Sequence, residues 1–282
     1  MGDIIETIGS STIQHGPSND RIYLMKLHAD DAPDIIAHLD RIAAERGYSK
    51  VFVKVPQWCV NIFIAAGYEL EASIPFFFPE NNAACFMGKY FCAIRETEGQ
   101  PQLVKDILAA AKAQEPTARS LPLPDGFSMR VALPEDAQQM ATVYREVFAT
   151  YPFPIHDPAF LQSAMAGNTI FFGIWQGNKI AALSSAEMDP SSYSVEMTDF
   201  ATLPEYRGHG LALNLLQQME VAVRTLGIRS LFTIARAYSF GMNITFARDG
   251  YSFGGTLTNN TNISGSLESM NVWYKPQPQP VQ

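Results

Sequence analysis

The sharpest chemical signal in the sequence is a glycine-containing turn within TDFATLPEYRGHGLALNLL, residues 198–216. Arg207, Gly210 and Ala212 form an R-x-x-G-x-A pattern between an expected strand, 194–202, and an amphipathic helix. Glycine permits close backbone approach, and the first N–H groups of a helix have no internal partner. The spacing therefore predicts a cradle for a pyrophosphate.

Four carboxylates surround the strand that precedes this turn. Glu187 ends one expected strand, Asp189 lies two residues beyond it, and Glu196 and Asp199 lie in the next strand. Such an acidic run suits attraction of an ammonium group, although a solvated face is an equal alternative for Glu187 and Asp189.

The composition limits the classes of protein that could hold these residues. The chain has 282 residues, 17% charged, with a net charge of −8 and a pI near 5.1. This is a globular composition, and the negative charge disfavours nucleic-acid and membrane surfaces but suits a small cationic substrate. Without a signal peptide or an apolar span, we expect a cytoplasmic protein. Three cysteines without a CxxC pair and five histidines without ligand spacing predict no metal site.

The elements that position the turn belong to the second of two domains. A Pro-rich linker at 116–126 follows a helix expected over 101–115, so 101–126 connects residues 1–100 to a domain at 127–276, and 277–282 form a disordered tail. In the second domain we expect strands at 127–131, 169–175, 179–187, 194–202, 231–235, 251–258 and 267–274, with helices from 134, from 211 to Gly227 and over 240–249. The fold class is α+β with a mixed sheet.

An internal repeat links the two domains. NITFARDGY at 243–251 is similar to NIFIAAGY at 61–68, and RTLGIRSLF at 224–232 is similar to AERGYSKVF at 44–52. Several matches in the same order favour a duplicated half-domain.

The chain resembles the GCN5-related N-acetyltransferases, whose acetyl-CoA motif is Q/R-x-x-G-x-G/A, over residues 127–275. The strings VEMTDFATLPEYRGHGLA and LTNNTNISGSLESMNVWYK are similar to the β-lysine N-acetyltransferases, which make a compatible solute. The resemblance implies acetyl-CoA as co-substrate, no metal, and a cofactor site formed by Phe200, Ala201, Thr202, Arg207, Gly208, His209, Gly210, Leu211, Ala212, Asn243 and Phe246.

The resemblance also implies direct transfer of acetyl to an amine, which needs a base. Glu196, eleven residues before Arg207, has the spacing at which histone-type members place theirs, and Asp199 is the rival if a bulge turns it toward the cleft. Many members carry a tyrosine as general acid where this chain has Phe246. Tyr238, Tyr251 or water would have to replace it.

For the acceptor, we expect the ε-amine of β-lysine, with Glu187 binding the ammonium and Arg236 the carboxylate. Asn259, Asn260 and Asn262, expected in the turn between the last strands, are further substrate candidates. The alternatives are acetylation of a protein lysine or N-terminus, and a non-catalytic acetyl-CoA sensor. A homodimer is left open.

The first domain is predicted to be a smaller, degenerate GNAT-like half-domain without a CoA site. An offset of 180 aligns Gly47 with Gly227 and places Leu27, Asp30 and Ala32 at the signature positions. Asp30, Asp31 and Pro33 would repel phosphate or lack an N–H to offer it.

Overall fold

The computed structural model describes residues 3–32, 34–117 and 122–277, so Pro33 and most of the expected tail lie outside the described residues. The first half alternates strands and short helices. Its elements are β1 (Ile4–Ile8), β2 (Ser11–Gly16), β3 (Arg21–Lys26), α1 (Ile35–Arg46), β4 (Lys50–Pro56), α2 (Val60–Ala65), β5 (Glu69–Ile74), β6 (Ala84–Tyr90) and α3 (Ala93–Glu96), with 3-10 turns at Ala29–Asp31, Gln57–Cys59 and Pro79–Asn81. The connecting helix α4 (Pro101–Lys112) follows.

The second half has the strands and helices that its periodicity predicts. They are β7 (Phe127–Val131), α5 (Ala137–Val147), α6 (Pro158–Ala166), β8 (Thr169–Gln176), β9 (Lys179–Asp189), β10 (Ser194–Thr202), α7 (Leu211–Val223), β11 (Ser230–Arg236), α8 (Phe240–Arg248), β12 (Ser252–Ile263) and β13 (Ser266–Pro276), with 3-10 turns at Pro134–Asp136, Pro204–Tyr206 and Arg224–Leu226. The α+β prediction is confirmed.

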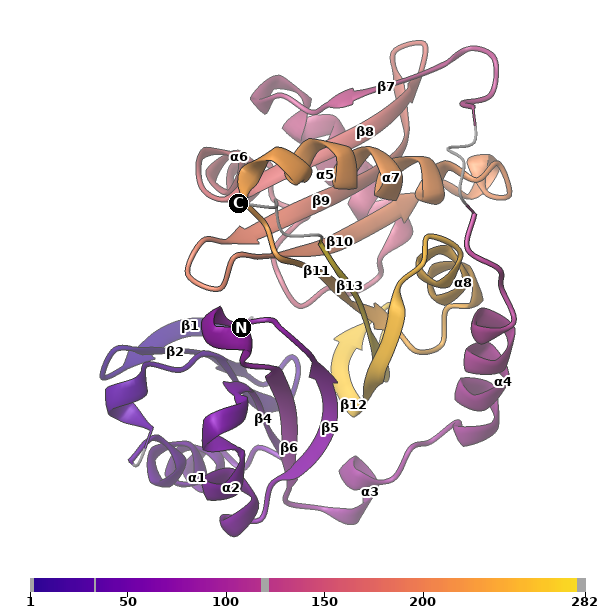
Figure 1. The fold of residues 1–282 in the computed structure, drawn as a ribbon. Coiled ribbons are helices and arrows are strands. Elements are labelled where there is room, and N and C mark those ends of the chain that lie inside the picture. Colours follow the sequence, from indigo (N-terminus) through magenta and orange to yellow (C-terminus); the bar gives the residue numbers. More distant parts are fainter. Residues whose placement is uncertain (1–2, 33, 118–121, 278–282) are drawn as a thin grey trace.

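All the strands join one mixed sheet, in the order β1-β2-β3-β4-β6-β5-β12-β13-β11-β10-β9-β8-β7. The two halves lie side by side, with β5 against β12 at their junction (Figure 1). Each half contains one parallel pair of strands, β3 with β4 and β10 with β11. Next to the second strand of each pair lies an antiparallel hairpin, β6 and β5 beside β4, and β13 and β12 beside β11. Counted outward from the junction, the strands β5, β6, β4 and β3 of the first half therefore correspond in order to β12, β13, β11 and β10 of the second half.

A glycine makes the junction between the halves possible. Gly255 of β12 pairs with Ala72 of β5 and has a φ of +144°. A Cβ at this position would lie 2.2 Å from the Glu71 carbonyl oxygen, so any side chain would push the two strands apart.

Three apolar clusters hold the layers together. One lies between α1, α2 and the sheet of the first half, and a second lies between α7, α8 and the sheet of the second half. The third joins residues of both halves, including Phe52, Phe77 and Phe86 of the first and Tyr144, Phe148 and Phe232 of the second. Burial of this shared cluster ties the halves into one structure.

Before Gly47, the two repeats correspond with a different offset from the one that the sequence predicts. The offset of 180 aligns β4 with β11 and the left-handed caps Gly47 and Gly227, but the helices start at residues 35 and 211, an offset of 176. The second copy carries an extra 3-10 turn, Arg224–Leu226. Asp34, rather than Asp30, therefore occupies the position of Gly210, and the position remains acidic.

None of the described helices is long and apolar enough to cross a membrane. The described residues also contain no group of three His, Cys, Asp or Glu side chains placed to hold a metal ion.

Candidate active site

A cavity of about 850 Å³ opens where two parallel strands separate. β10 and β11 pair over only three positions, from Ser194↔Ser230 to Glu196↔Phe232, and then diverge while each continues. Backbone groups beyond Glu196 and Phe232 therefore face the gap without pairing from strand to strand, and one of them, the Ile234 N–H, bonds the Glu196 carboxyl.

The predicted turn forms one wall of this cavity. Gly210, at φ +73°, occupies the N-cap of α7, and no side chain caps the helix. Gly208 has φ +85°, and a Cβ there would meet nothing within 4 Å. Arg207, Leu211 and Ala212 also line the cavity, so the uncapped first N–H groups of α7 point to an anion site there. These residues fit the pyrophosphate of a coenzyme A.

The structure places most, but not all, of the predicted cofactor residues on the cavity. Phe200, Thr202 and Phe246 line it together with the turn. Ala201 instead faces the shared apolar cluster, and His209 lies outside on the exposed turn, bonded to the Tyr206 carbonyl oxygen.

Asn243 also lies off the cavity wall, contrary to the prediction that it binds cofactor. Its side chain is fully buried. Its Nδ2 donates to the carbonyl oxygens of Arg236 and Ser239, and its Oδ1 accepts from Asn271 and Trp273 at 2.8 and 2.9 Å. Asn243 therefore fixes the start of α8 to β11 and β13, and its polar groups are already occupied.

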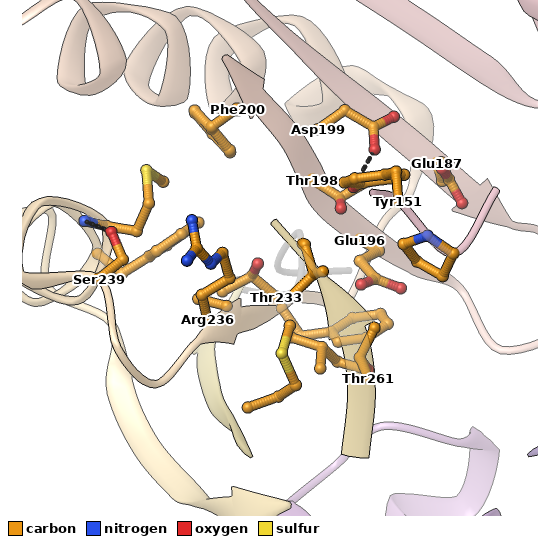
Figure 2. A pocket seen from close by; sticks show the side chains of 18 of the residues that line it. Tyr151, Glu187, Glu196, Thr198, Asp199, Phe200, Thr233, Arg236, Ser239 and Thr261 are labelled. Carbon is orange, nitrogen blue, oxygen red and sulfur yellow. Dashed lines mark hydrogen bonds between the residues drawn. The ribbon is translucent and has the colours of Figure 1, made fainter. Parts of the chain in front are cut away.

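The acidic run does converge on the cavity. Glu187, Asp189, Glu196 and Asp199 all line it, and Glu187 pairs directly with Glu196 across β9 and β10. Glu196 points from its strand toward the space faced by Thr233 and Thr261 (Figure 2). The cavity therefore has an acidic end that suits a cationic acceptor.

Burial makes Glu196 a base suited to neutral pH. Desolvation raises the pKa of its carboxyl to about 7, the positive charge of Lys54 opposes this rise, and the negative charge of Asp199 adds to it. Burial, together with the charges of Asp199 and Glu196, also raises the pKa of the cavity-facing Glu187 well above its usual value. A pKa near the working pH is what a general base requires.

The bulge considered for β10 exists and turns Asp199 into the cavity wall. The β9–β10 register shifts between Thr198 and Ala201, and Asp199 has φ +55°. One of its oxygens accepts a hydrogen bond from Tyr151, and the other accepts one from Ser185 at 2.6 Å. Because both oxygens are engaged, Asp199 is better placed to fix Tyr151 than to remove a proton.

The two tyrosines considered as general acids do not line the cavity. Tyr238 donates to Glu98 at 2.5 Å, and Tyr251 is buried against Phe246. Phe246 itself lines the cavity but has no proton to give. Two residues with hydroxyl groups line the cavity in this region: Thr245 of α8 and Ser239 just before the helix.

The structure does not support the prediction that Arg236 binds the carboxylate of the acceptor. Arg236 lines the cavity, but its Nε and Nη2 donate to both oxygens of Glu268, at 2.9 and 2.7 Å. Its charge is therefore neutralised by a buried carboxylate.

The three asparagines do not form a turn. β12 continues through them to Ile263, and they lie at or beside an irregularity between Leu257 and Thr261. Asn259 donates to carbonyl oxygens of Ile94, Arg95 and Thr97, and Asn262 donates to that of Ser18. Both therefore hold the first half in place, and only Asn260 lines the cavity.

Sequence reasoning missed the residues that the first half contributes. Arg21, Tyr23, Phe52 and Lys54 all line the same cavity from β3 and β4. Lys54 lies over the rings of Phe77 and Phe232, at 5.7 and 5.8 Å. A lysine inside the otherwise apolar run VFVKVP was the one available signal.

Comparisons with known proteins agree with this geometry. Residues 137–242 match the model of the Acetyltransferase (GNAT) family. The chain is 41% identical over 275 residues to the β-lysine N(6)-acetyltransferase of Methanococcus maripaludis, covering 98% of this chain and 99% of that protein. It is 32% identical over 269 residues to the N-acetyltransferase YodP of Bacillus subtilis, covering 94% and 96%.

Among solved structures, the ribosomal-protein-S18-alanine N-acetyltransferase from Escherichia coli matches with a TM-score of 0.48 and 15% identity, over 55% of this chain and 97% of that one. The full-length relatives and the match across the cavity-forming segment identify the chain as a member of the GNAT family of acetyltransferases, an acetyl-CoA-dependent N-acetyltransferase.

Proposed function

We propose that the chain transfers acetyl from acetyl-CoA to the ε-amine of β-lysine. The observation that carries this proposal is the position of Glu196 at the point where β10 and β11 separate, at the acidic end of the cavity. The relative from Methanococcus maripaludis, which matches over nearly the whole chain, is a β-lysine N(6)-acetyltransferase.

The site residues divide into two groups. Arg207, Gly208 and the first N–H groups of α7 would hold the pyrophosphate of acetyl-CoA, which supplies the acetyl thioester when bound. The charge of Asp189 attracts the ammonium group of the acceptor, and Glu187 offers it a carboxyl oxygen as hydrogen-bond acceptor.

Glu196 makes the amine nucleophilic by accepting its proton. A lysine-type amine has a pKa near 10.4, so deprotonation at pH 7 costs about 4.6 kcal/mol without a base. A carboxyl with a pKa of about 7 is half ionised at neutral pH and can take that proton as the amine reacts.

A small acceptor fits the cavity better than a protein chain. Seven residues of the first half, from β2, β3 and β4, line the cavity: Thr12, Arg21, Tyr23, Met25, Lys26, Phe52 and Lys54. Because the first half encloses part of the cavity, we expect it to accept a free amino acid more readily than an extended peptide.

The first half itself is proposed to be a degenerate GNAT-like half-domain without a CoA site. Its strand order and parallel pair support this, as does Asp34 at the position equivalent to Gly210. A carboxylate at a helix start opposes a bound phosphate.

A thiol-release assay over a panel of amines tests the proposed function. We expect β-lysine to give the highest kcat/KM, and thermal shift to show extra stabilisation when β-lysine is added to the acetyl-CoA complex. Release with peptides but not with free amino acids would contradict the proposal.

A further inference from the structure

The cavity contains a buried arginine that the mechanism above does not use. Arg21 of β3 lines the cavity wall and is only 4% exposed. None of the carboxylates among the described residues lies at ion-pair distance from its guanidinium group. A buried charge without a counter-ion is costly unless something else neutralises it.

The contacts of Arg21 leave part of its hydrogen-bonding capacity open. Its Nη1 donates to the carbonyl oxygen of Asn260 and to Thr261 Oγ1, the latter at 3.1 Å. Its guanidinium lies over the rings of Tyr23 and Phe52, at 5.4 and 5.5 Å. Nε is buried without an acceptor, and no acceptor for Nη2 is found in the described part of the chain. Three of the five N–H groups are thus unengaged.

The side-chain oxygen of Asn260 is also without a hydrogen-bond partner among the described residues. Its Oδ1 is buried without a donor, although the residue lines the same cavity. Because Arg21 bonds the Asn260 backbone, a cation without an anion and an acceptor without a donor lie next to each other. A carboxylate and a neighbouring ammonium group would satisfy both.

This pair belongs to the acceptor end of the cavity. Thr261, which Arg21 contacts, faces the same space as Glu196 (Figure 2). Tyr23 lies in the field of both groups. Burial chiefly raises the pKa of its phenol, Glu196 raises it further, and Arg21 lowers it. Another arginine of the cavity wall, Arg236, is already paired with Glu268.

We propose that Arg21 binds the carboxylate of the amino-acid acceptor and that the Asn260 side chain accepts from the amino group next to it. The inference rests on the proposed function and assigns the first half a direct role in choosing the substrate. The reacting amine lies at Glu196, and the amino-acid end lies against β3. The enzyme therefore selects amino acids over simple amines.

The test compares acceptors that differ in one group. β-Lysine carries both groups, its carboxamide lacks the carboxylate charge, and 6-aminohexanoate lacks the second amine. We expect the wild-type protein to favour β-lysine over its carboxamide by ~10- to 100-fold in kcat/KM, the range for hydrogen bonds to charged groups. Equal use of the acid and the carboxamide by the wild-type protein would overturn the proposal.

Arg21→Gln should abolish this preference by raising KM for the acid, with kcat and acetyl-CoA affinity nearly unchanged. Arg41→Gln is the matched control, since it makes the same substitution at an exposed position of α1 in the same half, outside the cavity, and should keep the preference. An equal loss for acid and carboxamide in Arg21→Gln would refute the assignment. If that variant does not fold, Arg21→Lys must weaken the preference, and an unchanged preference refutes the assignment.

Asn260→Ala should reduce the difference in kcat/KM between β-lysine and 6-aminohexanoate. An unchanged difference in this variant would contradict the role of Asn260. If the protein acetylates these amines but does not prefer the acid to the carboxamide, this inference is rejected and the proposed function stands. If the protein acetylates none of these acceptors, both the proposed function and this inference are rejected.

Discussion

Replacing Glu196 by glutamine tests the catalytic base with almost no change in shape. Glutamine keeps an acceptor oxygen in the cavity but cannot take a proton. The carboxyl that it replaces has a pKa of about 7, because burial raises this pKa more than the positive charge of Lys54 lowers it. Acetyl-CoA affinity should stay the same, because the α7 turn that holds the pyrophosphate is untouched.

The expected loss follows from the protonation of the acceptor. At pH 7 an amine of pKa 10.4 is free in only about one molecule in 2500. General-base catalysis contributes typically 10²- to 10⁴-fold, so Glu196→Gln should lower kcat by ~10²-fold or more. Between pH 7 and pH 9 the free amine increases ~100-fold, and the variant should gain by that factor.

The assay is thiol release across pH 5–9 for both proteins. Because only the ionised carboxylate of Glu196 accepts a proton, wild-type kcat/KM should fall about tenfold per pH unit below its pKa and level off above it. The variant should lack this acidic limb, and the two rates should approach each other at pH 9. A constant ratio from pH 7 to pH 9, or this behaviour in Asp199→Asn instead, would refute the assignment of Glu196.

Three further variants examine the rest of the site. Gly210→Val should weaken acetyl-CoA binding at least ~10-fold by calorimetry, since a β-branched side chain opposes the left-handed φ of +73° and intrudes on the anion site, and unchanged affinity would remove the role of this turn. Lys54→Met should move the acidic limb of kcat/KM to higher pH, because the lysine charge lowers the pKa of Glu196, and an unmoved limb would show that the first half does not tune the base. Tyr151→Phe should lower the free energy of unfolding by about 1–2 kcal/mol in denaturant titrations, because the buried Asp199 loses a donor, and wild-type stability would mean that this bond contributes nothing.

Local patterns predicted the parts of the site that lie close together along the chain. The R-x-x-G-x-A turn, its preceding strand and Glu196 fall within nineteen residues, 194–212, and their strand-turn-helix geometry follows from periodicity and glycine alone. The bulge at Asp199 was anticipated as an alternative, but its partners Tyr151 and Ser185 were not, because they come from other elements.

Long-range contacts account for the errors. Asn259 and Asn262 were typical turn residues by composition, yet their side chains bond the backbone of the first half, more than 150 positions away. Arg236 was chosen as a free cation because its partner Glu268 lies 32 residues away on another strand. Arg21 and Lys54 were missed because pairing of β5 with β12 brings the first half to the cavity, and no local pattern encodes that pairing.

A single competition assay tests the central claim most directly. Acetyl-CoA is mixed with equal concentrations of β-lysine, lysine and a lysine-containing peptide, and mass spectrometry of the products gives the ratio of their kcat/KM values. The structure predicts that β-lysine acetylated on its ε-amine is the dominant product and that Glu196→Gln removes it at pH 7. Dominant acetylation of the peptide, or of the β-amine, would contradict the account.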